Sequence, residues 1–290
     1  MRPQLSAIEL DIDGKRVAAI RHCDPDSSDM PRMLCVHGWL DNANSFLPMM
    51  PHLPAFELVA IDLPGHGYSD ALPSGYSLHE ISYQLTRIIQ ALGWTSCHVM
   101  GHSLGACIAP LLAVANQPAV QTLSLIEGLG PMSEVAEKLP ERMARSLADR
   151  LSPSRYQSRV FASKDDALAS RMKAATLLGS SARLIIDRQL QEVQDGYRWR
   201  FDSRWRMASV QYQTEEQVQA VLSAVDCPVL TVIADEGYLI GRPETEQRLN
   251  CLPQRTEVTL AGHHHLHMDT PEPVAAAVNQ FLKTMPAMGG

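Results

Sequence analysis

The feature that most constrains this chain is the sequence Gly-His-Ser-Leu-Gly at residues 101–105. An apolar run at 97–100 precedes it, and a helical pattern over 106–116 follows. Glycines two residues before and after a serine suit a turn too tight for side chains at those positions. A surface loop with two glycines is the alternative, but the flanking strand and helix favour a nucleophile elbow. We therefore expect Ser103 to be a nucleophile, held clear of a sheet at a helix N-terminus.

Composition limits the classes of partner. The chain has 290 residues, enough for one large core with a small lid, and 45% of them are hydrophobic and 20% charged. The net charge is −7 without a basic stripe, which argues against a nucleic-acid partner. No apolar run approaches the ~20 residues that span a bilayer, so no membrane span is expected. We expect a monomer or homodimer that acts on a small molecule.

The cysteine pattern bears on the compartment. The six cysteines are scattered and form no Cys-x-x-Cys pair, and two of them, Cys35 and Cys97, fall inside expected strands. Such cysteines are typical of buried apolar side chains in a reducing environment, with a structural disulfide as the alternative. Residues 1–6 also lack an apolar signal region. The sequence therefore predicts a cytoplasmic protein.

Short apolar segments alternate with helical patterns along the chain. An Asp-Gly turn at residues 13–14 predicts a hairpin at a sheet edge. Continuous apolar runs are typical of buried parallel strands. Such runs lie at 33–36, 58–61 and 97–100, and further strands are expected at 120–126, 229–233 and 257–260. Helices are expected at 77–92, 106–116 and 271–285. This order predicts an α/β protein with a mostly parallel sheet of about eight strands and helices on both faces.

One long segment interrupts this alternation. Residues 131–212 look mainly helical, are rich in Arg, Ser, Met and Ala, and contain no run that resembles a buried strand. We call this stretch the cap segment, and we expect a core of 1–130 and 213–290 into which it is inserted as a helical lid. An insertion at the carboxyl edge of a parallel sheet would cover the place where ligands bind. Arg, Asp and aromatic residues alternate at 199–206, which favours a hinge between lid and core over an anion-binding site.

A serine nucleophile needs a base, and the order in this architecture is Ser, acid, His. The loop after the last expected strand contains four histidines, His263, His264, His265 and His267. A metal site is the alternative explanation of this cluster. Metal ligands must converge, however, and adjacent residues point in different directions, so we expect no metal.

Several segments together carry a family resemblance. They are residues 37–46 (His-Gly-Trp-Leu-Asp-Asn-Ala-Asn-Ser-Phe), 65–69 (Gly-His-Gly-Tyr-Ser), the serine motif, and 262–268 (Gly-x-His-x-x-His-Met). Over nearly its full length the chain resembles the α/β-hydrolase superfamily, and within it the serine hydrolase-like proteins. The resemblance implies the α/β-hydrolase fold and a catalytic histidine seven residues before a proline. Pro271 then selects His264 as the base, with His267 as a supporting residue.

An oxyanion requires two backbone N–H donors aimed at it. The elbow supplies the N–H of Leu104, and the resemblance implies that of Trp39. The resemblance also implies that His37 braces the oxyanion loop and does not act as the base. We expect the Trp39 side chain, as a wall or as a hydrogen-bond donor, together with His37 and His102, to line the substrate pocket.

The acid is the open assignment. Many family members carry an aspartate shortly after the strand at 229–233, where this chain has Tyr238 or Ile240, with Asp235 shifted toward the strand. Some relatives, which haloalkane dehalogenases resemble, carry the acid at the end of the preceding core strand instead. In this chain Glu127 follows the expected strand at 120–126 and stands at that position. A buried carboxylate needs a partner, which His264 would supply. We rank Glu127 first and Asp235 as the alternative.

These residues predict a serine hydrolase that cleaves a small-to-medium carboxylic ester through an acyl-enzyme, without a cofactor. Thioester or amide cleavage stays open. Relatives that are dehalogenases or epoxide hydrolases have an aspartate in place of Ser103, so neither chemistry is expected. Two other classes remain: a carbon–carbon bond hydrolase or perhydrolase-like enzyme with the same triad, and a non-catalytic ligand-binding pseudo-enzyme.

Overall fold

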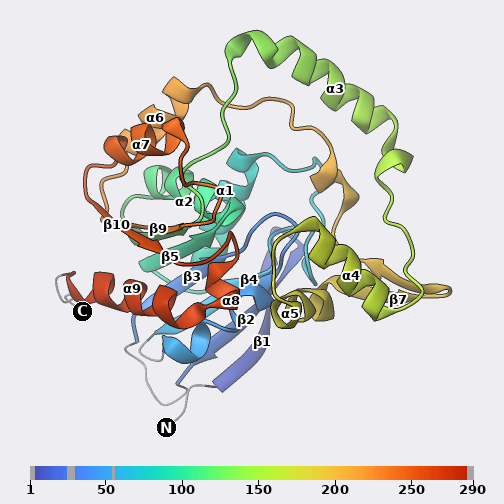
Figure 1. The fold of residues 1–290 in the computed structure, drawn as a ribbon, viewed down its shortest axis with the longest axis horizontal. Coiled ribbons are helices and arrows are strands. Elements are labelled where there is room, and N and C mark those ends of the chain that lie inside the picture. The colour runs from blue at the N-terminus through green and yellow to red at the C-terminus, as the bar shows by residue number, and fades with distance from the viewer. Residues whose placement is uncertain (1–3, 25–29, 54–55, 286–290) are drawn as a thin grey trace.

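A mostly parallel sheet forms the centre of the molecule (Figure 1). The computed structural model describes residues 4–24, 30–53 and 56–285. The prediction made from residues 1–6 therefore falls partly on residues outside the described ranges. Within these ranges one sheet contains eight strands in the order β1-β2-β4-β3-β5-β6-β9-β10. The strands are β1 (Gln4–Ile12), β2 (Lys15–Cys23), β3 (Arg32–Val36), β4 (Glu57–Ile61), β5 (Cys97–His102), β6 (Val120–Ile126), β9 (Val229–Ala234) and β10 (Arg255–Leu260).

The expected hairpin forms the antiparallel edge of this sheet. Strands β1 and β2 pair with Ile12 opposite Lys15, and the two turn residues Asp13 and Gly14 both have positive φ, 53° and 75°. Such angles are those that an Asp-Gly hairpin turn requires. Strand β2 pairs antiparallel with β4, and the remaining strands run parallel. The prediction of a mostly parallel sheet of about eight strands is confirmed.

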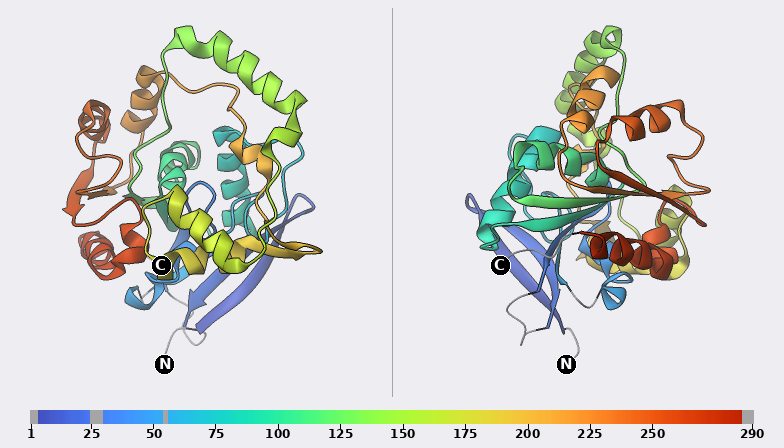
Figure 2. Two further views of the ribbon diagram at one scale, coloured as in Figure 1. Left: turned by 45° about the vertical axis from the view of Figure 1, so that its right-hand side comes forward. Right: turned by 90° about the vertical axis from the view of Figure 1, so that its left-hand side faces the viewer.

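Helices cover both faces of the sheet, as Figures 1 and 2 show. One face packs its apolar residues against α1 and α2, and the other face packs against α9. The Ser77 side chain accepts a hydrogen bond from the Glu80 N–H and so caps α1, as expected. The helices outside the cap segment are α1 (Leu78–Ala91), α2 (Leu104–Ala115), α6 (Glu215–Ser223), α7 (Pro243–Cys251), α8 (Leu266–Asp269) and α9 (Pro271–Lys283), with 3-10 turns η1 (Ala43–Phe46) and η2 (Met50–His52).

The cap segment lies between β6 and α6, where its two ends meet in a bridge between Ser133 and Gln213. Helix α3 arches away from the sheet (Figures 1 and 2), while α5 packs against α4 and against η1. A hairpin, β7 (Leu190–Val193) with β8 (Gly196–Trp199), departs from the helical expectation. The other elements are η3 (Ala136–Lys138), α3 (Leu139–Leu151), η4 (Pro153–Tyr156), α4 (Lys164–Ala174), α5 (Gly179–Gln189) and η5 (Ser203–Arg206).

Buried polar contacts join the cap segment to the core. The Arg188 Nε lies 2.9 Å from both carboxylate oxygens of Asp62, an ion pair that is almost fully buried. Near the other end of the segment, Asp202 accepts a hydrogen bond from the Tyr76 hydroxyl, and Arg204 donates to the Leu72 carbonyl oxygen. These contacts support the hinge interpretation of residues 199–206, because Asp202 and Arg204 both anchor this segment to the core.

Two further observations concern the remaining sequence expectations. All six cysteines are free, and burial raises the pKa of the Cys97 thiol to about 12. Over the described ranges, the helices include none with the length and apolarity needed to cross a membrane.

Candidate active site

Ser103 occupies a strained turn between β5 and α2. Its φ and ψ are 51° and −111°, a conformation rare for a residue with a side chain. A Cβ at Gly101 would lie 2.5 Å from the Gly105 carbonyl carbon, and a Cβ at Gly105 would lie 1.9 Å from the Val36 carbonyl oxygen. Both glycines are therefore required by the close approach of backbone to backbone, and the turn presents Ser103 at the start of α2.

A chain of hydrogen bonds starts at the Ser103 hydroxyl. The Oγ of Ser103 lies 2.9 Å from Nε2 of His264, and Nδ1 of the same imidazole lies 3.1 Å from Oε2 of Glu127. The His264 and Glu127 side chains are buried, whereas Ser103 is partly exposed. A carboxylate only accepts hydrogen bonds, so Nδ1 carries the proton and Nε2 faces the hydroxyl as an acceptor. That tautomer is the one a general base for Ser103 requires.

Glu127 is held at the end of β6 by backbone groups of the last residue of β9 and of the loop that follows it. Its Oε1 accepts a hydrogen bond from the Ala234 N–H at 2.9 Å, and its Oε2 accepts one from the Tyr238 N–H at 2.7 Å. A Cβ at Gly237 would lie 2.3 Å from Oε2, so the loop can pass over the carboxylate only with glycine there. The Glu127 backbone itself has a φ of 51°.

The alternative acid has a different environment. The Asp235 carboxylate accepts a hydrogen bond from the Gly262 N–H at 2.8 Å, and its own N–H donates to the Leu260 carbonyl oxygen. It thereby ties the β9 loop to the loop that carries the histidines. Across the described residues no hydrogen bond or ion pair joins Asp235 to His264, whereas Glu127 makes both.

The two expected oxyanion donors lie on the elbow and on the loop after β3. Neither the Leu104 N–H nor the Trp39 N–H donates to a protein acceptor in the parts of the chain that the structure describes. The Trp39 side chain is half exposed, and its indole Nε1 donates to the Trp205 carbonyl oxygen at 2.9 Å. This indole N–H is thus already used by the cap segment, which favours the interpretation of Trp39 as a wall.

His37 and His102, expected in the pocket, are both fully buried. The His37 Nδ1 lies 2.7 Å from the Gly38 carbonyl oxygen, and its Nε2 accepts from the Leu63 N–H. The Nε2 of His102 lies 2.9 Å from the carbonyl oxygen of His264. Burial lowers the pKa of both imidazoles, that of His102 well below its usual value. Both side chains therefore brace loops behind the site, and neither reaches a solvent-filled pocket here.

A second polar cluster lies directly behind the histidine loop. The Asp41 carboxylate is 3.3 Å from Nε2 of His265 and 3.8 Å from Nδ1 of His102, and it forms an ion pair with Arg171 of α4. Burial would raise the pKa of Asp41, but the charges of Arg171 and His265 hold it well below its usual value. His267 is buried beside them, and neither of its ring nitrogens has a hydrogen-bond partner among the described residues.

This cluster is also the place where a metal could be considered. One donor atom each from Asp41, His102 and His265 lies within 4.8 Å of the others. The guanidinium of Arg171 already supplies positive charge to the same carboxylate. A divalent cation there would therefore be repelled by Arg171 at close range in a buried environment.

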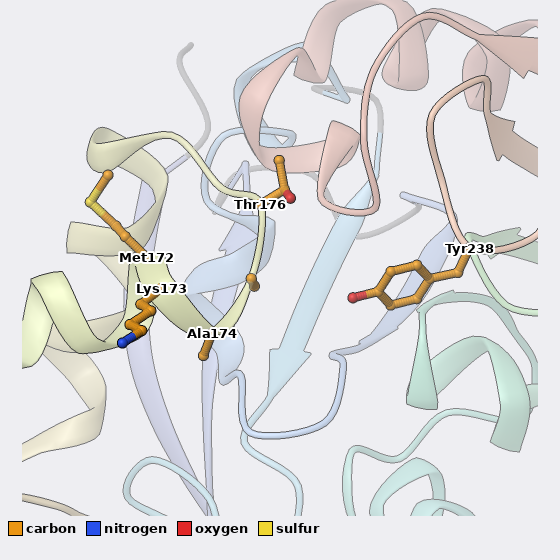
Figure 3. A pocket seen from close by; sticks show the side chains of 6 residues that line it. Met172, Lys173, Ala174, Thr176 and Tyr238 are labelled. Carbon is orange, nitrogen blue, oxygen red and sulfur yellow. The ribbon is translucent and has the colours of Figure 1, made fainter.

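Tyr238 connects the hydrogen-bonded chain to a pocket. Its ring stacks on the His264 imidazole with centroids 3.9 Å apart and an angle of 23° between the planes. The pocket, about 250 Å³ in volume, is lined by this tyrosine and by residues of the last turn of α4 and just after it. Figure 3 shows the Tyr238 hydroxyl pointing across the pocket toward the loop that carries Thr176. Tyr238 thus contacts the His264 imidazole and also lines this pocket.

Three contacts at the site were missed by sequence reasoning. Asp41 lies in the motif at residues 37–46, but no role was assigned to it, and Arg171 was not singled out. Tyr238 was noted only for standing where an aspartate was expected. No local pattern signals such contacts, because they join segments far apart in the sequence, as the Arg171–Asp41 pair does across 130 residues. The Gly237-Tyr238 pair, which is separated from the end of β9 by two residues, was the available cue for the loop around Glu127.

Comparisons with known proteins agree with this architecture. A model of the family described as the α/β hydrolase fold matches residues 31–271. The chain is 27% identical over 272 residues to a serine hydrolase-like protein of Danio rerio, which covers 87% of this chain and 81% of that protein.

Solved structures of similar proteins extend over almost the whole chain. A hypothetical protein of Pseudomonas aeruginosa PAO1 superposes with a TM-score of 0.86 at 32% identity, covering 95% of this chain and 97% of that one. A thioesterase domain from the curacin biosynthetic pathway gives a TM-score of 0.81 at 26% identity, covering 96% and 99%.

Proposed function

The chain belongs to the α/β-hydrolase fold family, and from that premise we propose that it is a serine hydrolase. We propose further that it cleaves carboxylic esters of small to medium size through an acyl-enzyme on Ser103. The observation that carries this proposal is the continuous hydrogen-bonded chain from Ser103 Oγ through His264 to Glu127. A serine hydroxyl is a weak nucleophile until such a base is in contact with it.

The proposed reaction has two halves. In the first, Ser103 Oγ attacks the ester carbonyl while His264 Nε2 takes the hydroxyl proton, and the N–H groups of Leu104 and Trp39 stabilise the oxyanion. His264 then gives that proton to the departing alcohol. In the second half, water gives a proton to His264 and attacks the acyl-enzyme, and the proton returns to Ser103 as the acid leaves. Glu127 keeps Nδ1 protonated and stabilises the imidazolium throughout.

The pseudo-enzyme alternative was motivated by the missing aspartate after β9. The contact between Glu127 and His264 weakens that motive, because a carboxylate from the preceding strand occupies the position behind the base. Two backbone N–H groups also hold this carboxylate in place, which supports a pre-organised acid and not an incidental contact.

Thioesters are a second candidate class of substrate. The likeness to a thioesterase domain at 26% identity favours this candidate, and a thioester passes through the same acyl-enzyme with a thiol as the leaving group. The carbon–carbon bond hydrolase alternative uses the same three residues, so a substrate panel must decide among them. Hydrolysis of p-nitrophenyl esters of graded chain length, acyl thioesters and a β-diketone would separate the three classes.

Labelling by a fluorophosphonate probe tests the proposal directly. We expect the wild-type protein to be labelled and Ser103→Ala to remain unlabelled, because the probe reacts only with an activated serine hydroxyl. Ser69→Ala, which removes a hydroxyl that hydrogen-bonds to Asp62, is the matched control and should be labelled like wild type. A folded wild-type protein that no fluorophosphonate labels would exclude the hydrolase and leave the binding protein.

A further inference from the structure

One residue contacts both the acid and the base of the proposed site. The Tyr238 N–H donates to Glu127 Oε2 at 2.7 Å, and the Tyr238 ring stacks on the His264 imidazole at 3.9 Å. The backbone of this residue therefore fixes the carboxylate while its side chain covers one face of the ring that the carboxylate orients. The side chain is 54% exposed, so burial of an apolar ring does not account for its position.

We infer that Tyr238 is a positioning residue for His264. Its ring holds the imidazole in the plane in which Nε2 meets Ser103, and it stabilises the imidazolium that forms when Ser103 loses its proton. This inference rests on the proposed function and deepens it. Many family members carry an aspartate in this loop, where this chain has Tyr238. The Tyr238 ring acts on the face of the imidazole, while Glu127 acts on its edge.

The Tyr238 ring acts on both the motion and the charge of the imidazole. Hydrogen bonds at Nδ1 and Nε2 fix the imidazole along the line through its nitrogens, but they allow it to rock about that line. A parallel ring at 3.9 Å opposes this motion on one face. A cation over an aromatic face is also attracted by the ring quadrupole, so the stack favours the protonated imidazole over the neutral one. Both effects are largest in the transition state, where the imidazole is charged.

The other groups around His264 do not duplicate this contact. Glu127 and Ser103 meet the edge of the imidazole through its nitrogens. His102 lies at 4.8 Å between ring centroids in a tilted arrangement, and His265 lies at 5.2 Å edge-on. His267 also acts electrostatically on this group, but burial holds the pKa of His102 and His267 well below its usual value, so both stay neutral. Tyr238 alone among these neighbours offers a stacked, uncharged π-face.

The test measures kcat/KM and kcat against pH for hydrolysis of a p-nitrophenyl ester by the full chain. Tyr238→Leu keeps an apolar side chain over His264 but removes the π-face. We expect kcat to fall about fivefold and the midpoint of the acid limb to move down by ~0.5 pH unit, because the imidazolium loses its stabilising partner and releases its proton at lower pH. A loss of folding would lower activity without moving this midpoint.

Ring-retaining variants supply the controls. Tyr238→Phe and Tyr238→Trp should keep the wild-type midpoint and lose at most about threefold in kcat, since each retains an aromatic face. The inference would be overturned if the acid limb of Tyr238→Leu kept the wild-type midpoint. It would also be overturned if the midpoint shifted as far in Tyr238→Phe as in Tyr238→Leu. Fluorophosphonate labelling separates the two failures: an unlabelled wild type ends the proposed function, whereas a labelled wild type with no Tyr238→Leu shift ends only this inference.

Discussion

At the scale of single residues, Glu127 shows how a buried carboxylate can be stabilised by the hydrogen bonds that it accepts. Three N–H donors converge on its two oxygens, from Ala234, Tyr238 and His264. An isolated buried carboxylate would be costly, but one that accepts several hydrogen bonds is not. Its backbone is held at positive φ, which a residue with a side chain adopts only where its surroundings require it. The strain directs the side chain toward the histidine loop.

Replacing this acid should cost far more than replacing the alternative one. In Glu127→Gln the negative charge behind His264 is lost, and the amide NH₂ must face either the Ala234 N–H or the N–H groups of Tyr238 and His264. In the second orientation His264 also loses its acceptor or adopts the wrong tautomer. We expect kcat for ester hydrolysis to fall by about 10³- to 10⁴-fold. Asp235→Asn should stay within about threefold of wild type, because an amide oxygen can still accept from Gly262. If kcat falls more in Asp235→Asn than in Glu127→Gln, the assignment of Glu127 is wrong.

At the scale of elements, the site is built where loops follow β3, β5, β6, β9 and β10. Parallel strands have their carboxyl ends at the same edge of the sheet, so the topology alone brings residues that are distant in sequence together there. What the loops add is close approach, and each close approach depends on a particular glycine. Gly105 lets α2 pass the end of β3, and Gly237 lets the β9 loop pass over the Glu127 carboxylate.

The close approach of Gly237 to the Glu127 carboxylate can be tested by substitution. In Gly237→Ala the new methyl would lie 2.3 Å from Glu127 Oε2, so loop and carboxylate must separate. We expect a loss of about 1–3 kcal/mol in the free energy of unfolding, measured by urea denaturation, together with a fall in kcat. Gly179→Ala is the matched control, since its new methyl would meet nothing nearer than 3.8 Å. Equal stability of the two variants would contradict the account of this loop.

At the scale of the whole molecule, the protein buries several histidines in neutral form. Burial holds the pKa of His66, His102 and His267 well below its usual value in the folded protein. In the unfolded chain each would titrate near pH 6.5. Below that pH the unfolded chain binds protons that the folded protein excludes, so the free energy of unfolding decreases as pH falls. The stability that these groups contribute is fully present only above about pH 6.5.

His267 is the residue at which this linkage can be measured. In the part of the chain that the structure describes, its ring nitrogens have no hydrogen-bond partner, so His267→Leu loses no hydrogen bond there and removes one titrating group. Between pH 6 and pH 5 we expect the wild-type free energy of unfolding to fall more steeply than that of the variant, by up to about 1.4 kcal/mol per pH unit. His79→Leu, at an exposed position, should keep the wild-type slope. Parallel slopes for wild type and His267→Leu would refute this account.

The sequence predicted most of the sheet because its strands are buried on both faces and therefore read as continuous apolar runs, such as residues 58–61 within β4. It did not predict the β7–β8 hairpin. Those strands are short and mostly half-exposed, and the Asp-Gly at 195–196 was the only local signal. The assignment of Ser103, His264 and Glu127 as catalytic residues stays a prediction, which the structure makes testable by placing all three within hydrogen-bond reach.

By itself, the sequence determined the fold, the elbow around Ser103 and the loop that carries His264, because apolar periodicity and glycine spacing are local properties of the chain. Only the tertiary structure decided which carboxylate lies behind the base, that His37 and His102 are buried, and that Tyr238 stacks on His264. These are contacts between loops from different strands. Their geometry depends on strand order and on single close approaches such as that of Gly237, which no local pattern encodes.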